Sequence, residues 1–153
     1  MSIHKSILSW ERAPHPEDPA TYSRNHIATL SGGQQLRVSA SVDYKGDKDS
    51  ADPEQMVVSA VSSCHMLFFL AIAESQGLTV DRYEDRAVGY VEKGSAGRPV
   101  ITRIELSPAI TFGGDKIPNA AAISRMHAGA HKNCFIGNSL TAEVVIKEGT
   151  LCA

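Results

Sequence analysis

The cysteine at position 64 lies in the middle of the most apolar stretch of the chain, inside the polar cluster Ser62-Ser63-Cys64-His65. Polar side chains in a buried segment destabilise a protein unless they are paired or used. A thiol acts as a nucleophile only as its thiolate, so a nearby cation has to lower the pKa of Cys64. Arg24, His65 and His131 are the candidates. The competing interpretation is an inert core thiol, the common state of a buried cysteine.

A second group of reactive side chains follows at His127, His131 and Cys134. Histidines at i and i+4 share one face of a helix. With Cys134 behind them and Cys64 as a fourth ligand, they have the types needed for a structural zinc site. The alternative is an exposed His127 and a His131 that is stabilised at a helix C-terminus by the helix dipole. The residues alone leave both interpretations open.

The composition is that of a soluble globular protein with a small ligand. The 153 residues are 42% hydrophobic and 21% charged, and the formal net charge is −2. Because no stretch gathers several basic residues without acids, we expect no nucleic-acid or membrane partner. The first residues lack the apolar core of a secretory signal, which favours the cytoplasm. Three cysteines are too few for a disulfide framework, and we assign no role to Cys152, the penultimate residue.

The first half of the chain predicts three strands followed by a long helix. Residues 3–10, 25–30 and 36–44 alternate roughly between apolar and polar types, as half-buried strands do, and Gly32-Gly33 predicts a hairpin turn. Asp52, Pro53 and Gln55 form a helix-start signature with a capping box. The helix should end near Gly77. Its apolar core, residues 56–73, is long enough to span a membrane, but its central serines and histidine favour a helix buried on most sides within a protein.

The second half predicts two long strands, a helix and a last strand. Residues 78–92 and 100–112 are expected to form an antiparallel pair, residues 119–133 a helix, and residues 139–147 a strand. Strands and helices that are segregated in this way favour an α+β fold, with an antiparallel sheet packed on the long helix. The length fits a single domain over residues 1–153.

Several motifs resemble the OsmC/Ohr family, named for osmotically inducible and organic-hydroperoxide-resistance proteins. They are Asp52-Pro53-Glu54-Gln55, the helix carrying Ser63-Cys64-His65-Met66, the later Ala130-His131-Lys132-Asn133-Cys134, and Asn138-Ser139-Leu140. The resemblance covers nearly the whole chain. The Pro-Glu-Gln before the first cysteine, together with Ala-His-x-x-Cys before the last strand, makes a fairly specific pair.

The resemblance implies an intertwined homodimer with an OsmC-like fold and two active sites near the subunit interface. It implies that Cys64 is the peroxidatic cysteine and that Cys134 is the resolving cysteine. The arginine and glutamate that such proteins pair with the thiolate fall on Arg24 and Glu54. Arg37, on a neighbouring predicted strand, is the alternative to Arg24.

This resemblance implies a thiol-dependent peroxidase without a cofactor. Arg24 would stabilise the thiolate and Glu54 would orient the guanidinium. Cys64 would attack the peroxide and become a sulfenic acid, Cys134 would convert it to a disulfide, and an external thiol or dihydrolipoyl group would reduce that disulfide. The apolar run at residues 66–69 favours an organic hydroperoxide over hydrogen peroxide. The Cys-His-Met sequence differs from the Cys-Phe of better-studied members.

One geometric point bears on the site: Glu54 and Cys64 are ten residues apart, about 15 Å on a straight helix. We therefore predict a site at or across the dimer interface. Two other functions remain open, the zinc-binding structural module built from His127, His131, Cys134 and Cys64, and a non-catalytic binder of a small ligand. His65 either faces the pocket or makes a hydrogen bond in the core.

Overall fold

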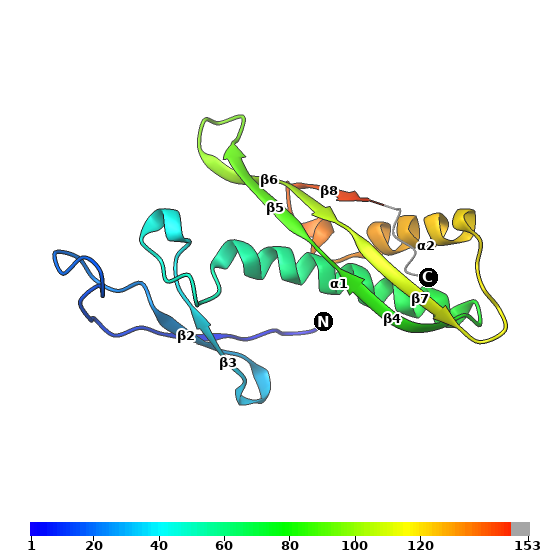
Figure 1. Ribbon diagram of the computed structural model, residues 1–153, viewed down its shortest axis with the longest axis horizontal. Helices are drawn as coiled ribbons and strands as arrows, with labels where there is room; N and C mark the ends of the chain where they lie inside the picture. Colours follow the sequence, from blue (N-terminus) through cyan, green and yellow to red (C-terminus); the bar gives the residue numbers. More distant parts are fainter. Residues whose placement is uncertain (148–153) are drawn as a thin grey trace. The chain divides into compact units, whose positions relative to one another are not determined.

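The structure is a computed structural model and describes residues 1–147. Cys152 therefore lies outside the described residues. The chain divides into two compact units, Met1–Met56 and the part from Val57 onward, and each is described by itself (Figure 1). The expectation of a single domain over residues 1–153 stays a prediction.

The N-terminal unit is a small antiparallel sheet of three strands, β1 (Ile7–Ser9), β2 (His26–Thr29) and β3 (Gln35–Val38). The turn between β2 and β3 forms where it was predicted, and Gly32 and Gly33 both have positive φ, at 80° and 76°. All three strands are shorter than predicted. Residues Val42–Tyr44 form a 3-10 helix instead of continuing the third strand, so the prediction was wrong for that segment.

Helix α1 (Pro53–Ser75) begins and ends as the sequence predicted. The backbone N–H of Gln55 donates to Asp52 Oδ1 at 2.7 Å, and the backbone N–H of Asp52 donates to Gln55 Oε1 at 3.2 Å. This is the reciprocal arrangement of a capping box. At the other end, Gly77 adopts the left-handed conformation, with φ 66°, that stops the helix.

Only one stripe of α1 is buried within the chain. Val61, His65, Phe69 and Ala73 recur every four residues and are all buried, whereas Leu67 is 59% exposed. By length and composition this helix could cross a membrane, yet only 22% of its most apolar 18-residue window is buried. The prediction of a helix buried on most sides was therefore wrong for the chain on its own, because the rest of the chain covers only one stripe of this helix.

The second unit contains five strands in two sheets. One sheet is β4 (Thr79–Asp85) with β7 (Pro108–Gly113), and the other is β5 (Val88–Lys93), β6 (Pro99–Leu106) and β8 (Glu143–Ile146). Each predicted long strand is interrupted, one at residues 86–87 and the other at Ser107. Strand β4 pairs with β7 and β5 pairs with β6, antiparallel as predicted. Strand β8 instead runs parallel to β6, with Glu143 opposite Arg103. The three-stranded sheet is therefore mixed, and the prediction of a wholly antiparallel sheet was wrong.

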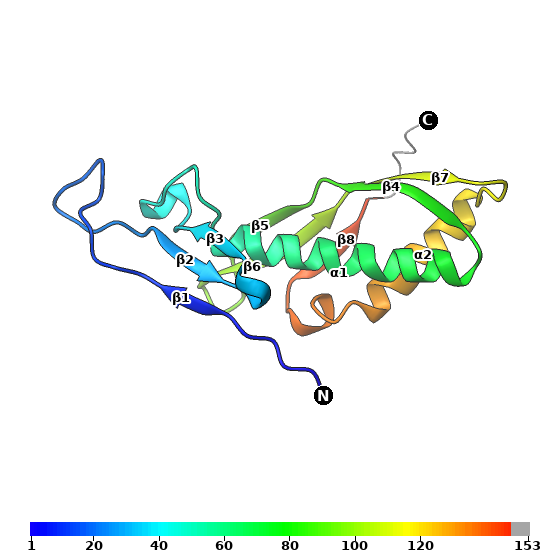
Figure 2. The same ribbon diagram turned by 90° about the horizontal axis from the view of Figure 1, so that it is seen from below.

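Helix α2 (Ala120–Asn133) completes this unit, and Asn119 caps it by accepting a hydrogen bond from the backbone N–H of Ala122 at 2.9 Å. Figure 2 shows α1 and α2 below β4 and β7. One core cluster joins Phe69, Met126 and Ile110, and a second joins Val61, Ile104 and Leu106.

A glycine sets the contact between the two helices. A side chain at Gly129 would place its Cβ 3.0 Å from Ile72 Cδ1. That distance is tighter than an ordinary carbon–carbon contact. The absence of a side chain therefore lets α2 lie close against α1.

Candidate thiol site

The structure brings Cys64 and Cys134 together. Cys64 lies in the middle of α1, and Cys134 is the residue at which α2 ends. Both are free thiols, and a hydrogen bond between their side chains contributes to raising the pKa of Cys134. The two cysteines that the resemblance paired are therefore in contact, although 70 positions separate them in the chain (134 − 64).

The pKa of Cys134 reflects opposing influences. Burial raises it most, since the residue is 2% exposed, and the hydrogen bond with Cys64 raises it further. The backbone N–H of Gly137 donates to Cys134 Sγ at 3.2 Å, and this bond and one from the backbone of Ile136 lower the pKa. On balance the pKa of Cys134 is raised, so Cys134 is a protonated thiol at neutral pH.

The turn after α2 fixes the position of Cys134. The backbone N–H of Asn138 donates to the Cys134 carbonyl at 2.9 Å, and the Asn138 side chain donates to the Lys132 carbonyl at 3.0 Å. Ser139 Oγ donates to the Phe135 carbonyl at 2.8 Å. These bonds satisfy carbonyl groups at and just beyond the end of the helix. The side chains of Asn138 and Ser139 therefore have a structural role in the turn that follows Cys134.

Next to the thiols, His65 and His127 form a buried pair. His65 Nε2 lies 3.0 Å from His127 Nδ1, and the rings stack with centroids 5.3 Å apart. The residues are 1% and 3% exposed. Burial, reinforced by the nearby His127 and His131, lowers the pKa of His65 to about 4. His65 therefore makes a core hydrogen bond, one of its two predicted roles, and an exposed His127 is wrong.

The four predicted zinc ligands are not assembled as a metal site. No group of three or more His, Cys, Asp or Glu side chains within residues 1–147 is arranged to hold a metal ion. His127 is held against His65 in the core, and His131 is exposed. The described part of the chain therefore supports the thiol pair and not the zinc arrangement.

The two charged residues that the resemblance assigns to the site belong to the N-terminal unit and are described within it. The guanidinium of Arg24 stacks on the Tyr22 ring, 4.2 Å from its centroid, and donates to Thr21 Oγ1 at 3.2 Å and to the Tyr22 carbonyl. Glu54, in the first turn of α1, forms no ion pair with any residue in the described range 1–147. This chain thus does not join Arg24 to Glu54, and their roles stay predictions.

A family profile described as OsmC-like protein matches residues 46–149. The chain belongs to the OsmC-like protein family. An OsmC-like protein of unknown function from Vibrio cholerae is 39% identical to it, with a TM-score of 0.90 over 96% of this chain and 99% of that one. A comparison with curated proteins found no match.

More distant structures share the fold. An organic hydroperoxide resistance protein OsmC from Legionella pneumophila has 14% identity and a TM-score of 0.64, and covers 96% of each chain. The organic hydroperoxide resistance protein OhrB of Bacillus subtilis has 15% identity and a TM-score of 0.66, over 95% of this chain and 98% of that one. The OsmC-like α+β fold predicted from the motifs is therefore confirmed.

Sequence reasoning missed one polar contact beside the thiols of this OsmC-like chain. Ser62 Oγ donates to Asp85 Oδ2 at 2.5 Å, and the backbone N–H of Ser107 donates to Asp85 Oδ1 at 2.7 Å. Asp85 thus ties α1 to both interruptions of the long strands. The polar type of Ser62 was noted, but its partner could be found only from the break in strand alternation near Asp85-Arg86.

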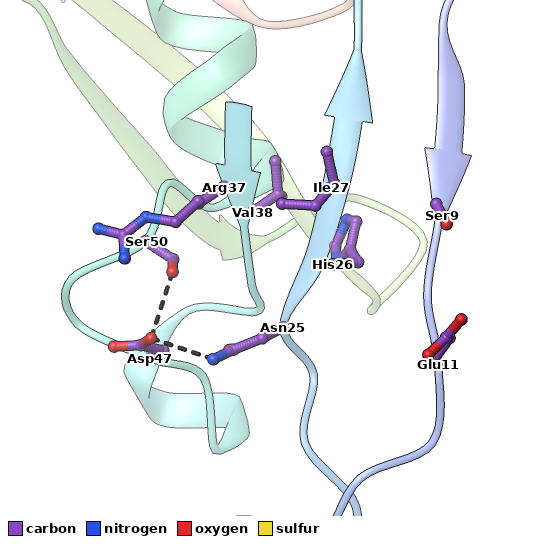
Figure 3. Close-up of a pocket in the computed structure, with 9 residues that line it drawn as sticks. All are labelled: Ser9, Glu11, Asn25, His26, Ile27, Arg37, Val38, Asp47 and Ser50. Atoms are coloured by element: carbon purple, nitrogen blue, oxygen red, sulfur yellow. Dashed lines mark hydrogen bonds between the residues drawn. The ribbon is translucent and has the colours of Figure 1, made fainter. Parts of the chain in front are cut away.

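A pocket of about 350 Å³ in the N-terminal unit was also missed (Figure 3). Its lining includes Arg37, the predicted alternative to Arg24, but not Arg24 itself; the complete lining is Ser9, Glu11, Asn25, His26, Ile27, Arg37, Val38, Asp47 and Ser50. Asp47 accepts hydrogen bonds there from the backbone of Asp49, from Ser50 and from Asn25. These bonds, led by that of Asp49, and the charge of Arg37 hold the pKa of Asp47 below its usual value.

Proposed function

We propose that this OsmC-like protein is a thiol-dependent peroxidase that reduces organic hydroperoxides through Cys64 and Cys134. The observation that carries the proposal is the contact between the Cys64 and Cys134 side chains. This contact holds the two sulfur atoms as neighbours, as a peroxidatic and a resolving cysteine have to be. Family membership supports the same chemistry, since the OsmC/Ohr family is associated with peroxidase-type redox activity.

The reaction runs in two covalent steps. The Cys64 thiolate attacks the terminal oxygen of the hydroperoxide, the O–O bond breaks, and the alkoxide takes a proton and leaves as an alcohol. Cys64 is now a sulfenic acid. Cys134 attacks its sulfur, the S–O bond breaks, and a disulfide and water form. The contact between Cys64 and Cys134 is what makes the second step intramolecular.

Apolar side chains around the thiols suit an organic substrate. Leu67 and Phe135 are 59% and 72% exposed, and Phe68 packs edge-on against Phe135 with ring centroids 5.2 Å apart. A hydrophobic alkyl group gains free energy by leaving water for such a surface, and hydrogen peroxide has no such group. The substrate class is therefore a hydrophobic hydroperoxide.

The same exposed surface supports a homodimer as the working form. A long apolar helix with one buried stripe leaves a face that water solvates poorly. A second copy covers that face and brings Arg24 and Glu54 to the thiols at the interface. Arg24 then stabilises the Cys64 thiolate, and Glu54 orients the guanidinium. The reductant is an external thiol or a dihydrolipoyl group, and the compartment is the cytoplasm.

Thiol counting with peptide mapping tests the proposal. Wild-type protein receives one equivalent of cumene hydroperoxide, beside a Cys64→Ser variant and a Cys152→Ser variant. We expect rapid formation of a Cys64–Cys134 disulfide in wild type and in the Cys152 variant, and none in the Cys64 variant. Thiols that remain unreacted would count against the peroxidase and favour the non-catalytic binder of a small ligand.

A matched pair of arginine variants tests the activating residue. Arg24→Met should lower kcat/KM on the order of a hundredfold, the usual cost of losing a donor to a developing charge. Arg37→Met is the matched variant, since Arg37 lines the pocket of the N-terminal unit shown in Figure 3 and Arg24 does not. The reverse ranking would assign the activating role to Arg37.

Disrupting the dimer tests the role of the interface. Leu67→Glu places a charge on the exposed face of α1 and should give a monomer in analytical ultracentrifugation. The monomer should lose peroxide reduction although Cys64 is intact, while Lys116→Glu, at the exposed loop before α2, should leave both properties unchanged. Full turnover by a proven monomer would contradict a shared site.

A further inference from the structure

The two sulfur atoms of the thiol pair differ in what surrounds them. Cys134 Sγ accepts a hydrogen bond from the backbone N–H of Gly137 at 3.2 Å, and the backbone of Ile136 supplies a second. Within residues 1–147, Cys64 Sγ accepts no backbone hydrogen bond, since its own helix uses the neighbouring N–H groups. Cys134 is 2% exposed, whereas Cys64 is partly exposed. The pair is therefore asymmetric in both hydrogen bonding and access.

The donors at Cys134 are fixed before any reaction takes place. The turn that carries Ile136 and Gly137 is closed by the bond from Asn138 N–H to the Cys134 carbonyl and braced by the side chains of Asn138 and Ser139. A Cβ at Gly137 would lie 3.4 Å from Cys134 Sγ, so the turn lies directly against the sulfur. Donors that are already in place need no reorganisation when negative charge develops.

From this asymmetry we infer that, in the oxidised protein, the reducing thiol attacks Cys64 Sγ, and Cys134 leaves as a thiolate held by the backbone N–H groups of Ile136 and Gly137. The inference rests on the proposed peroxidase function and specifies the direction of its reductive half. It makes Gly137 and Ile136 functional through their main chain, a role that no side-chain motif reveals. The mixed disulfide with the reductant is thus on Cys64.

Thiol–disulfide exchange depends on which sulfur can be reached and on how well the leaving thiolate is stabilised. Access favours attack at Cys64, because Cys64 is partly exposed and Cys134 is 2% exposed. The backbone donors at Cys134 partly offset the burial that raises its pKa, and so ease its departure as a thiolate. The alternative, attack at Cys134, needs the reductant to enter a buried site.

The step balances as a two-stage exchange. The reductant's thiolate forms a bond to Cys64 Sγ, the Cys64–Cys134 bond breaks, and its electron pair goes to Cys134 Sγ. A second thiol, the neighbour in a dithiol or another monothiol, then attacks the reductant's sulfur and releases Cys64. The reductant is oxidised to a disulfide, and both cysteines return to the reduced state.

Locating the mixed disulfide tests the inference. Trypsin places the three cysteines on separate peptides, because Lys48, Arg82, Lys132 and Lys147 bound segments with one cysteine each. The protein, in a Cys152→Ser background, is oxidised with diamide, exposed briefly to glutathione, quenched in acid and mapped by mass spectrometry. We expect glutathione on the Cys64 peptide in excess over the Cys134 peptide on the order of tenfold or more.

Each outcome separates this inference from the proposed function. Glutathione mainly on Cys134, or equally on both, would overturn the inference and leave the peroxidase proposal intact. Because diamide replaces the peroxide, a protein that ignores cumene hydroperoxide but forms the disulfide still reports the direction of attack. A protein that forms no Cys64–Cys134 disulfide with either oxidant would overturn both.

A variant of the turn tests the donors themselves. Ile136 has φ −68°, which a proline can adopt, so Ile136→Pro removes its N–H with the backbone angle retained. Reduction of the disulfide by glutathione should slow about two- to tenfold relative to Ile136→Ala, as expected for one lost hydrogen bond. Equal rates in the two folded variants would contradict stabilisation by this donor. If Ile136→Pro does not fold, the mapping of the parent protein decides.

Discussion

Two contacts between α1 and α2 lie one residue apart on the first helix and have opposite character. The His65–His127 pair is buried in the core, and His65 Nδ1 has no hydrogen-bond partner among the described residues. The Cys64–Cys134 pair lies at the edge of that core, with one partly exposed sulfur and one that receives backbone hydrogen bonds. A rotation of about 100° around a helix axis separates the two positions. Although His65 is next to Cys64 in the sequence, its side chain points to the core, and we do not expect it to take part in peroxide reduction.

Replacing Cys64 and His65 one at a time gives the largest expected difference between the two contacts. Cys64→Ser should lower peroxide reduction on the order of a thousandfold or more, because the nucleophile is removed. His65→Gln, the matched change one position along, should keep the rate constant within about threefold once the folded fraction is equal. Steady-state assays with cumene hydroperoxide measure both. A similar loss in the two variants would make His65 a participant in the reaction.

The buried stripe should dominate stability. Phe69 is fully buried and contacts the ring of His127 at 4.5 Å between centroids, with Tyr83 and Phe112 also beside it. Phe69→Ala should lower the free energy of unfolding by about 3–5 kcal/mol. Chemical denaturation measures it, with Ile117→Ala, at an exposed residue, as the control. A loss below about 1 kcal/mol would mean that the stripe is not the main core.

Lowering the pH should reduce the stability of the folded protein through the buried His65. The pKa of His65 is about 4 in the folded protein and 6.5 in the unfolded chain, so unfolded protein binds the proton more tightly. Stability therefore falls as the pH drops from about 6.5 to about 4, by about 3 kcal/mol from this residue. Positive charge on His127 or His131 opposes protonation further.

The variant His65→Gln cannot titrate in that range and should lose less stability between pH 7 and pH 4 than wild type. Urea unfolding at a series of pH values gives the difference between the two slopes directly. Parallel slopes would mean that the histidine pair is hydrated in solution.

The smallest expected effect is at the polar link between helix and sheet. Ser62→Ala removes the hydrogen bond to Asp85 and leaves the one from Ser107 in place. We expect a loss of about 1–3 kcal/mol, the range for a hydrogen bond to a charged group. Ser59→Ala, at an exposed position one turn earlier on α1, is the control in thermal unfolding. Equal effects would show that Asp85 finds another donor.

Local signals in the sequence predicted the local parts of the fold. The bounds of α1 follow from Asp52, Gln55 and Gly77, which act within a few residues of themselves. The break at Ser107 was missed because apolar alternation continues across it. The break at residues 86–87 follows the charged run Glu84-Asp85-Arg86, which interrupts the alternation but was not interpreted as the end of a strand. The parallel pairing of β8 with β6 depends on where α2 packs, and no pattern within the strand encodes it.

The candidate site divides in the same way. The motifs placed Cys64 and Cys134 in one site, and the contact between them agrees. The pairing of His65 with His127 joins residues 62 positions apart, and the sequence offered only two polar residues on apolar faces. The donors at Cys134 are main-chain groups, which every residue type except proline carries. The residue types in the sequence therefore could not predict these donors.

Gly129 influences the distance between the two thiols. Two cysteines can be joined only when their Cα atoms lie within about 4.4–6.8 Å of each other. The missing side chain at Gly129 lets α2 approach α1 closely at Ile72, and the spacing of the helices affects the distance between the two sulfur atoms. Gly129→Ala would push the helices apart and slow the formation of the disulfide, although Gly129 carries no reactive atom.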